Sequence, residues 1–330
     1  MLGVRTSSAL PCPFGAWGTT HPPRFRVGTR IFLSIAIILL AIGCNRSPKV
    51  IPESPPEAVQ AVIEGLEDHQ PRVVWDALPA SYQTDIRDLI STFCSNMDAD
   101  IYDRMFRILG KAVQVMNEKK EFIHNSPVVL STPLLESSLG SQWNDTVGLL
   151  NTISKSDLSS LESLSRMDPG EFLGATGHQV MDTVEAMRVR SLRSPGLNRW
   201  AQMSQTLKQT KINFVNMSDN QGVLLFNSPT NDAVKEVDLT FVEGRWVPAD
   251  LAAAWPDKVN EARERMTKLS GPDFAKAKPI ISMLLGSLEG TMDSLLKAGS
   301  QKEFDEKLKS LAAIGGMAKA MANSKQQEAQ

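Results

Sequence analysis

Three histidines follow residue 44, and their imidazoles are the side chains best suited to metal binding or acid–base chemistry near neutral pH. They are His69, His124 and His178, and no two of them stand four residues apart. The chain also contains no HExxH motif and no paired Cys/His pattern. This spacing predicts no metal site, and we expect His69 to face the carbonyl end of a helix.

Motifs for nucleophilic or nucleotide chemistry are also missing, since the chain contains neither GxxxxGK[ST] nor GxGxxG. Gly286–Gly290 superficially resembles the GxSxG motif of a nucleophile elbow. It falls within an amphipathic helical pattern with no strand before it, so we reject this interpretation. Asp98, Asp100 and Asp103 lack the glycine and the distal glutamate of a calcium loop, so helix capping explains them better. We therefore expect no catalytic residue, no cofactor and no metal.

Cysteine chemistry is limited to three positions, Cys12, Cys44 and Cys94. Cys94 has the apolar neighbours Ile90 and Phe93 and no local histidine or base, so we expect an inert buried thiol there. Cys44 is different because it ends a long apolar run.

The run lies in the stretch Arg30–Cys44, RIFLSIAIILLAIGC. Its apolar part, Ile31–Ile42, fits the roughly 7–15 residues of a signal-peptide core and is too short for a spanning helix of about 20. Arg24, Arg26 and Arg30 supply the preceding positive charge. This pattern predicts a secretion signal.

The residues Ala41-Ile42-Gly43-Cys44 resemble the lipobox of bacterial lipoproteins, with Ile42 bulkier than the usual small residue. The resemblance implies that the Cys44 thiol carries diacylglycerol, that Gly43 is the last residue removed, and that the new amine receives a fatty acyl chain such as palmitate. More than one acyl chain gives durable anchoring. Asn45 is not the aspartate that favours inner-membrane retention in that family.

Three other interpretations of Ile31–Ile42 remain open: an ordinary cleaved signal, an uncleaved anchor, or a buried segment of a cytosolic protein. Residues 1–26 are long and rich in Pro, Gly and Thr, which is unusual before a signal core. One hypothesis is that translation starts at Val27. Residues 1–43 are treated as a leader that is removed, and they take no part in the predicted fold.

Charge excludes some classes of partner. The chain has 35 Lys+Arg and 37 Asp+Glu, and four arginines but no acid precede residue 44, which leaves a formal net charge of −6 for the mature part. A mildly acidic chain without a basic patch argues against nucleic-acid binding and against attachment to anionic headgroups. We therefore expect membrane attachment through the lipid, and an unidentified protein or apolar ligand as the partner.

The mature chain divides by composition into a Pro-rich tether at 44–56, a domain at 57–322 and a disordered polar tail at 323–330. Apolar residues recur at helical spacing through most of the domain, including 98–119, 172–192, 274–297 and 304–321. We expect a turn at Asp168-Pro169-Gly170 and an interruption near Trp255-Pro256 in the helix 251–269. A period of two over 211–248 predicts a small antiparallel β-meander. The fold class is α+β and predominantly helical.

The five tryptophans after residue 44 fall on apolar stripes or just after turns, so we expect them in the core rather than at a ligand site. They are Trp75, Trp143, Trp200, Trp246 and Trp255.

One further resemblance rests on early helices followed by a meander that ends in a Gly-x-Trp hairpin. The residues Pro56–Leu66, Val74–Leu78 and Phe241–Val247 resemble the NTF2-like superfamily, with the helical stretch 98–209 as a large insertion. The resemblance implies a cone between sheet and helices that holds an apolar ligand, or an enzyme of the isomerase or dehydratase kind that uses acids in that cone. Asp238 is the acid considered for this role, although strand alternation places it opposite Val237 and Leu239, toward solvent.

These observations predict a lipid-anchored protein of the cell envelope that faces the periplasm or the exterior. We expect a non-catalytic binding or scaffold protein, with the envelope enzyme as the alternative. A third option is that the C-terminal helices 273–321 bind a partner helix or a membrane surface, although their mixed charges favour packing on the domain.

Overall fold

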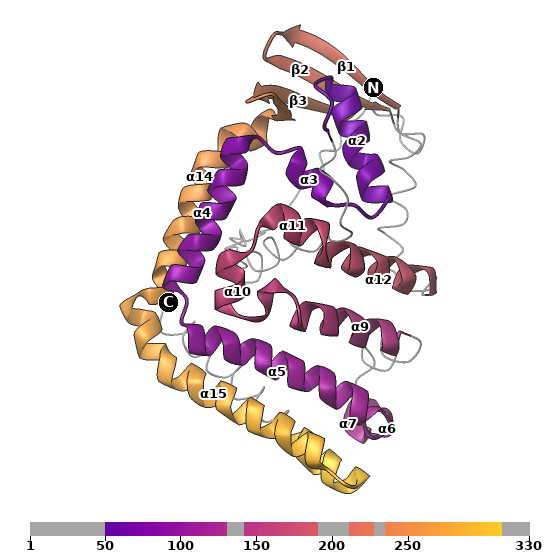
Figure 1. Cartoon of the computed structure of the whole chain (residues 1–330), viewed down its shortest axis with the longest axis vertical. Coiled ribbons are helices and arrows are strands. Elements are labelled where there is room, and N and C mark those ends of the chain that lie inside the picture. The colour runs from indigo at the N-terminus through magenta and orange to yellow at the C-terminus, as the bar shows by residue number, and fades with distance from the viewer. Residues whose placement is uncertain (1–49, 131–141, 191–210, 228–234, 312–330) are drawn as a thin grey trace, which may run out of the picture. The chain divides into compact units, whose positions relative to one another are not determined.

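The computed structural model describes residues 50–130, 142–190, 211–227 and 235–311. Contacts divide the chain into two units, Met1–Ile37 and Ile38–Gln330, and every described residue belongs to the second. The leader, Cys44 and the tail lie outside the described residues. No helix among the described residues is long and apolar enough to cross a membrane. Helices dominate and accompany one antiparallel sheet, which confirms the predicted α+β class (Figure 1).

The packed structure begins earlier than the end of the predicted tether. Ile51 is only 3% exposed, and the Trp246 indole N–H donates to the Glu53 carbonyl oxygen at 3.0 Å. Helix α2 (Pro55–Glu67) follows, with Pro at its first position, where no N–H is needed. Residues 51–56 therefore lie against the domain.

Helices α3 (Arg72–Asp76), α4 (Ala80–Asn96) and α5 (Ala99–Glu118) come next. Asp98 caps α5, as predicted, because its Oδ1 accepts the Ile101 N–H at 3.1 Å. The cap ends α4 and starts α5 within two residues, so the chain changes direction between them.

Short helices fill the middle of the chain. They are α6 (Lys120–His124), α7 (Pro127–Leu130), α9 (Trp143–Ser154), η1 (Asp157–Ser159), α10 (Leu161–Arg166), α11 (Pro169–Gly174) and α12 (Thr176–Arg190). The turn predicted at Asp168-Pro169-Gly170 is wrong. Asp168 is instead the cap of α11, because its Oδ1 accepts the Glu171 N–H at 2.9 Å and Pro169 occupies the first helical position.

The predicted meander is confirmed. Strands β1 (Lys211–Ser218), β2 (Gln221–Asn227), β3 (Lys235–Val242) and β4 (Arg245–Pro248) pair antiparallel in sequence order. Leu224, paired with Phe214 and Val237, is fully buried. The β3–β4 turn uses positive φ at Glu243 and Gly244, which tight hairpin turns require.

The chain ends in long helices. Helix α14 (Ala249–Thr267) leads through η2 (Lys268–Ser270) into α15 (Pro272–Lys297), and residues 301–311 form a last described helix. The predicted interruption at Trp255-Pro256 is wrong, since α14 continues through Pro256. Proline weakens a helix interior but tertiary contacts can hold it.

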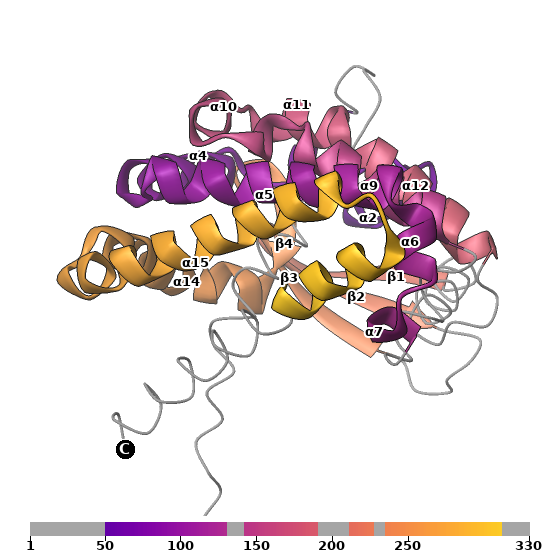
Figure 2. The same cartoon turned by 90° about the horizontal axis from the view of Figure 1, so that it is seen from below.

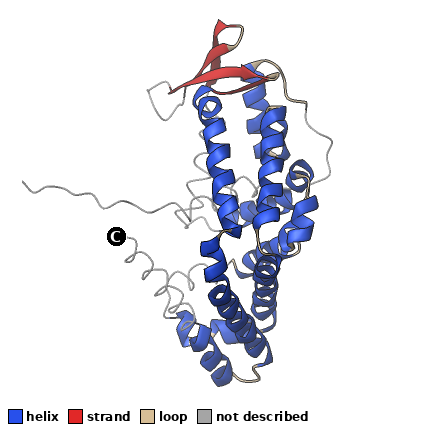
Figure 3. Cartoon of the chain, turned by 90° about the vertical axis from the view of Figure 1, so that its left-hand side faces the viewer, coloured by secondary structure: helices blue, strands red, loops and turns tan. Residues whose placement is uncertain are grey.

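Two pairs of parallel helices organise this arrangement. Helix α14 packs along α4, and α15 packs along α5 (Figures 2 and 3). The first pair is joined near its start by Trp255 and Tyr82 and near its end by Ser270 and Asn96. The second pair is joined near its start by Asp98 and Lys278 and near its end by Lys119 and Ala298. In each pair early residues contact early residues and late residues contact late ones, so the two helices run in the same direction.

The buried core is a series of small clusters between neighbouring helices. One surrounds Trp75 with Phe172 and Leu173, and another joins Trp143 to α5. A third, between α5 and the C-terminal helices, contains Phe304 at 0% exposure. Trp75 and Trp143 are thus core residues as predicted, whereas Trp200 lies outside the described residues.

Candidate functional site

A groove opens between the first described residues, helix α2 and strand β1. It has a volume of about 560 Å³ and is lined by Val50, Pro52, Pro56, Glu57, Gln60, Ala61, Glu64 and Ile212. This volume lies within the roughly 300–1,000 Å³ range of small-molecule sites. Five of these residues are apolar and the two titratable ones are acidic, so the groove suits an apolar ligand that carries positive charge.

A second cluster forms where α2 ends. His69 has a φ of +56°, and glycine is the usual residue in this left-handed conformation. The Gln70 N–H donates to the Gly65 carbonyl at 2.6 Å and the His69 N–H to the Leu66 carbonyl at 3.2 Å, which is the Schellman pattern of helix termination. The backbone thus turns sharply at His69 and directs its side chain away from α2.

The His69 side chain meets two residues of α12. Its Nδ1 lies 2.6 Å from Asp182 Oδ1, while His178 Nε2 lies 3.3 Å from Asp182 Oδ2. His178 and Asp182 are four residues apart, so they share one face of the helix. His178 Nδ1 also lies 2.9 Å from the His69 carbonyl oxygen. Two histidines and one carboxylate therefore form a single cluster between segments more than a hundred residues apart in sequence.

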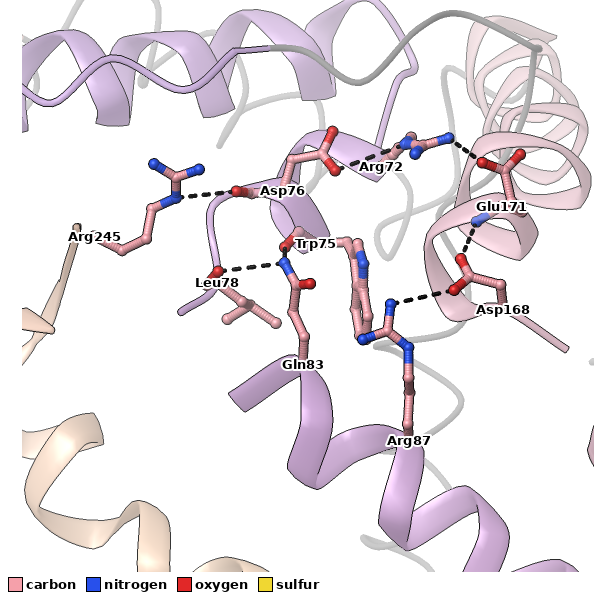
Figure 4. Close-up of polar contacts among 9 residues, drawn as sticks. All are labelled: Arg72, Trp75, Asp76, Leu78, Gln83, Arg87, Asp168, Glu171 and Arg245. Carbon is pink, nitrogen blue, oxygen red and sulfur yellow. Dashed lines mark hydrogen bonds and ion pairs between the residues drawn. The ribbon is translucent and has the colours of Figure 1, made fainter. Parts of the chain in front are cut away.

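The charged residues around Trp75 form a paired network between α3, α4 and α11 (Figure 4). The Arg87 guanidinium lies 5.0 Å from the centre of the Trp75 ring and donates to Asp168 Oδ2 at 3.2 Å. Arg72 donates to Glu171 Oε1 at 2.7 Å. Because each of these cations has an acidic partner and the indole is buried, the network holds three helices together rather than offering a binding site.

The acids compared with a calcium loop have structural partners. Asp98 caps α5 and also pairs with Lys278 of α15, and both contacts lower the pKa of its carboxyl. Asp103 Oδ1 accepts the Leu161 N–H at 2.8 Å. Helix capping and interhelical contacts therefore account for both carboxylates. Gly286–Gly290 lies inside α15, as expected.

The other residues singled out in the sequence lie outside the two candidate sites. Cys44 and Gly43 lie outside the described residues. Asp238 is exposed on β3, in line with the predicted orientation toward solvent. Cys94 is partly buried, and this burial raises the pKa of its thiol, which favours the unreactive protonated form.

The histidine cluster was not predicted from the sequence. His178 and Asp182 stand at His-x-x-x-Asp spacing, but metal-site motifs with two histidines four residues apart do not include this pair. The contribution of His69 is not visible in the sequence, because it depends on tertiary packing. The side chain of His69 contacts Asp182 rather than the helix carbonyls that we expected.

Comparison with known proteins gives no match. No family model, no curated protein and no solved structure matches the chain.

Proposed function

We propose that this is a lipid-anchored cell-envelope protein that binds a basic, partly apolar peptide segment of a partner in the groove between α2 and β1. The anchor is the lipidated Cys44 inferred from the stretch Arg30–Cys44. The protein acts as a binding or scaffold protein on the outer side of the membrane that holds it, facing the periplasm or the exterior.

The observation that carries this proposal is the position of the groove directly after the tether. Val50 and Pro52 line the groove, and Ile51 between them is buried. Ile51 is the seventh residue after Cys44, and a fully extended chain over these seven steps spans at most about 25 Å. A lipid on Cys44 would therefore keep the groove near the membrane surface, where it meets other envelope proteins.

Charge supports the choice of a basic ligand. Glu57 and Glu64 both face the groove, and none of the described residues that line it is basic. Gln60 Nε2 donates to Glu64 Oε1 at 3.1 Å, which helps fix that carboxylate on the rim. The mature chain also carries a net negative charge, which attracts cationic ligands over longer distances.

The anchoring is tested by the mass of the N-terminal peptide from a detergent extract of membranes. We expect a peptide that begins at Cys44 and carries diacylglycerol, and we expect Cys44→Ala to lack it and leave the membrane fraction. Cys94→Ala is the matched control and keeps the modification. An unmodified chain in the soluble cytosolic fraction would overturn the proposed anchor.

Binding in the groove is tested with two short peptides of alternating residues, one of lysine and leucine and one of glutamate and leucine. We expect the lysine peptide to bind at least about tenfold more tightly, since opposite charges favour association. The double variant Glu57→Gln/Glu64→Gln removes this preference, whereas Glu118→Gln on the exposed side of α5 keeps it. Equal binding of both peptides contradicts the assignment of the groove.

We propose an NTF2-like arrangement for the fold alone, with helices packed over the meander. It is supported by the packing of α2 against β1 and by the hairpin at Gly244, Arg245 and Trp246. The enzyme alternative has no such support, since Asp238 is exposed.

A further inference from the structure

The geometry points to a divalent metal site made by His69, His178 and Asp182, with zinc as the ion. This site is separate from the proposed peptide groove and does not depend on the lipid anchor. Imidazole nitrogens and carboxylate oxygens are ligands that zinc commonly takes.

The ligand atoms are close enough to share one ion. One atom from each of the three side chains can be chosen so that all three lie within 4.8 Å of one another. Zinc bonds of about 2.0–2.1 Å place tetrahedral ligands roughly 3.4 Å apart. The 3.3 Å between His178 Nε2 and Asp182 Oδ2 already matches this spacing, whereas the 2.6 Å between His69 Nδ1 and Asp182 Oδ1 is a hydrogen-bond distance that lengthens when an ion enters. Small rotations of the two imidazoles would bring the remaining pair together.

The orientation of His178 favours a cation at this place. A carbonyl oxygen only accepts hydrogen bonds, so His178 Nδ1, 2.9 Å from the His69 carbonyl, is the nitrogen that carries a proton. Nε2, 3.3 Å from Asp182 Oδ2, is therefore the nitrogen whose lone pair a metal ion would take. Metal-bound histidines usually donate their other ring N–H to a carbonyl or carboxylate in this way.

The backbone at His69 is a second, independent feature of the site. A non-glycine residue with positive φ is a strained choice, and such strain concentrates at functional sites. The strained residue supplies one imidazole to the cluster, and its own carbonyl orients the other. A glycine at this position would end α2 with less strain, but it would provide no ligand.

The cluster is also open to solvent. The side chains of His69, His178 and Asp182 are 29%, 23% and 49% exposed. An ion can therefore enter without unfolding of the domain. Three protein ligands leave a further coordination position for water, unlike the closed four-ligand sites that serve only structure.

Zinc binding is tested on the purified full-length protein in detergent, after chelator treatment, by calorimetric titration with zinc alone. We expect one saturable site, and we expect cobalt in place of zinc to give the intense visible bands of a low-coordinate ion. Titration that gives no heat above the buffer control, or the weak pale spectrum of fully hydrated cobalt, would overturn the proposal.

The variants separate a metal ligand from a structural hydrogen bond. His69→Gly keeps the left-handed helix end and removes the imidazole, and Asp182→Asn keeps the shape of the carboxylate but not its charge. Each should weaken zinc binding at least about tenfold. Loss of a residue that only hydrogen-bonds to a metal ligand already costs about tenfold or more in affinity, and loss of a ligand should cost no less. The matched controls, Asp88→Asn on the exposed face of α4 and His124→Gln, should bind zinc like the wild type.

The change in melting temperature on adding zinc separates loss of zinc binding from loss of stability in a variant. Zinc should raise the melting temperature of the wild type and of Asp88→Asn, because an ion that binds only the folded chain stabilises it. The rise should be clearly smaller for His69→Gly and Asp182→Asn, because their zinc affinity is lower. An equal rise in all four proteins would show that zinc binds elsewhere and would refute the site.

Discussion

The ring of Trp255 stacks on the ring of Tyr82, with centroids 4.1 Å apart and planes inclined by 6°. The same indole donates from Nε1 to Asp85 Oδ2 at 2.7 Å. These contacts join α14 to α4 next to the sheet, where the Ser81 N–H also donates to Glu243 at 2.8 Å. One residue thus anchors the first of the two parallel helix pairs by both packing and a charge-assisted hydrogen bond.

Replacing Trp255 by phenylalanine should therefore lower the free energy of unfolding by about 1–2 kcal/mol, measured by urea denaturation. The variant keeps an aromatic ring on Tyr82 but leaves the Asp85 carboxylate without the indole N–H. Asp85→Asn retains an oxygen acceptor but loses its charge, so it should cost less than Trp255→Phe, up to about 1 kcal/mol. If the two variants lose the same stability, the hydrogen bond is not the important part of the contact.

Two glycines in helices should respond in opposite ways to alanine. A methyl group at Gly65 would lie 2.6 Å from Val73 Cγ1, between α2 and α3, whereas nothing lies within 4 Å of the same position at Gly290 in α15. Gly65→Ala should cost about 1–3 kcal/mol because the buried Val73 must move. Gly290→Ala should stabilise the protein by up to about 1 kcal/mol through helix propensity.

Both glycine variants are measured by the midpoint and slope of urea unfolding, so that a change in stability is distinguished from a change in compactness. Stabilisation by Gly65→Ala would show that α2 and α3 are less closely packed than the distance to Val73 indicates.

Much of the fold could be predicted from local sequence. The Asp98 cap and the meander between residues 211 and 248 follow from side-chain chemistry and period alone, and the structure has both. The errors arise where one local signal has two meanings. Asp168-Pro169-Gly170 is a turn sequence, but Asp followed by Pro is also a helix start, and burial of Phe172 against Trp75 favours the helix.

Tertiary contacts decide the remaining differences. Pro256 lacks the N–H of a helix interior, yet α14 continues through it, next to the anchored Trp255. The single helix predicted over 172–192 is divided at Ala175, between Gly174 and Gly177, where helix propensity is low. Apolar periodicity predicts neither outcome. The same helical period runs through Pro256, where the helix continues, and through Ala175, where it is divided.

The histidine cluster marks the limit of prediction from sequence. The pair His178 and Asp182 follows from helical spacing, but His69 joins it from a distance of 113 residues. A histidine in a left-handed conformation is also unexpected where glycine is the common choice. The third member of the site is therefore determined by the packing of α2 and α12.

Three carboxylates connect stability to pH. Lys278 and the Ile101 N–H lower the pKa of Asp98. Burial alone would raise the pKa of Asp168 and of Glu289, but hydrogen bonds and nearby cations outweigh it and lower both values. For Asp168 these partners are the Glu171 N–H and Arg87, and for Glu289 they are Lys111 and Arg107, which join α5 to α15.

A folded-state pKa below the unfolded value means that the unfolded chain binds protons more readily. The stabilisation is then complete above the unfolded values, about 3.9 for Asp and 4.3 for Glu, and is lost as the pH falls through the lower folded values. Urea midpoints should therefore be steady from pH 7 to about 5 and decrease below about 4. Lys278→Met removes the main cause of the Asp98 shift, so its midpoint should fall less steeply with acid than that of the wild type. A wild-type midpoint that stays constant through this acid range, or a Lys278→Met curve that is merely displaced and parallel to it, would show that these ion pairs do not contribute to stability.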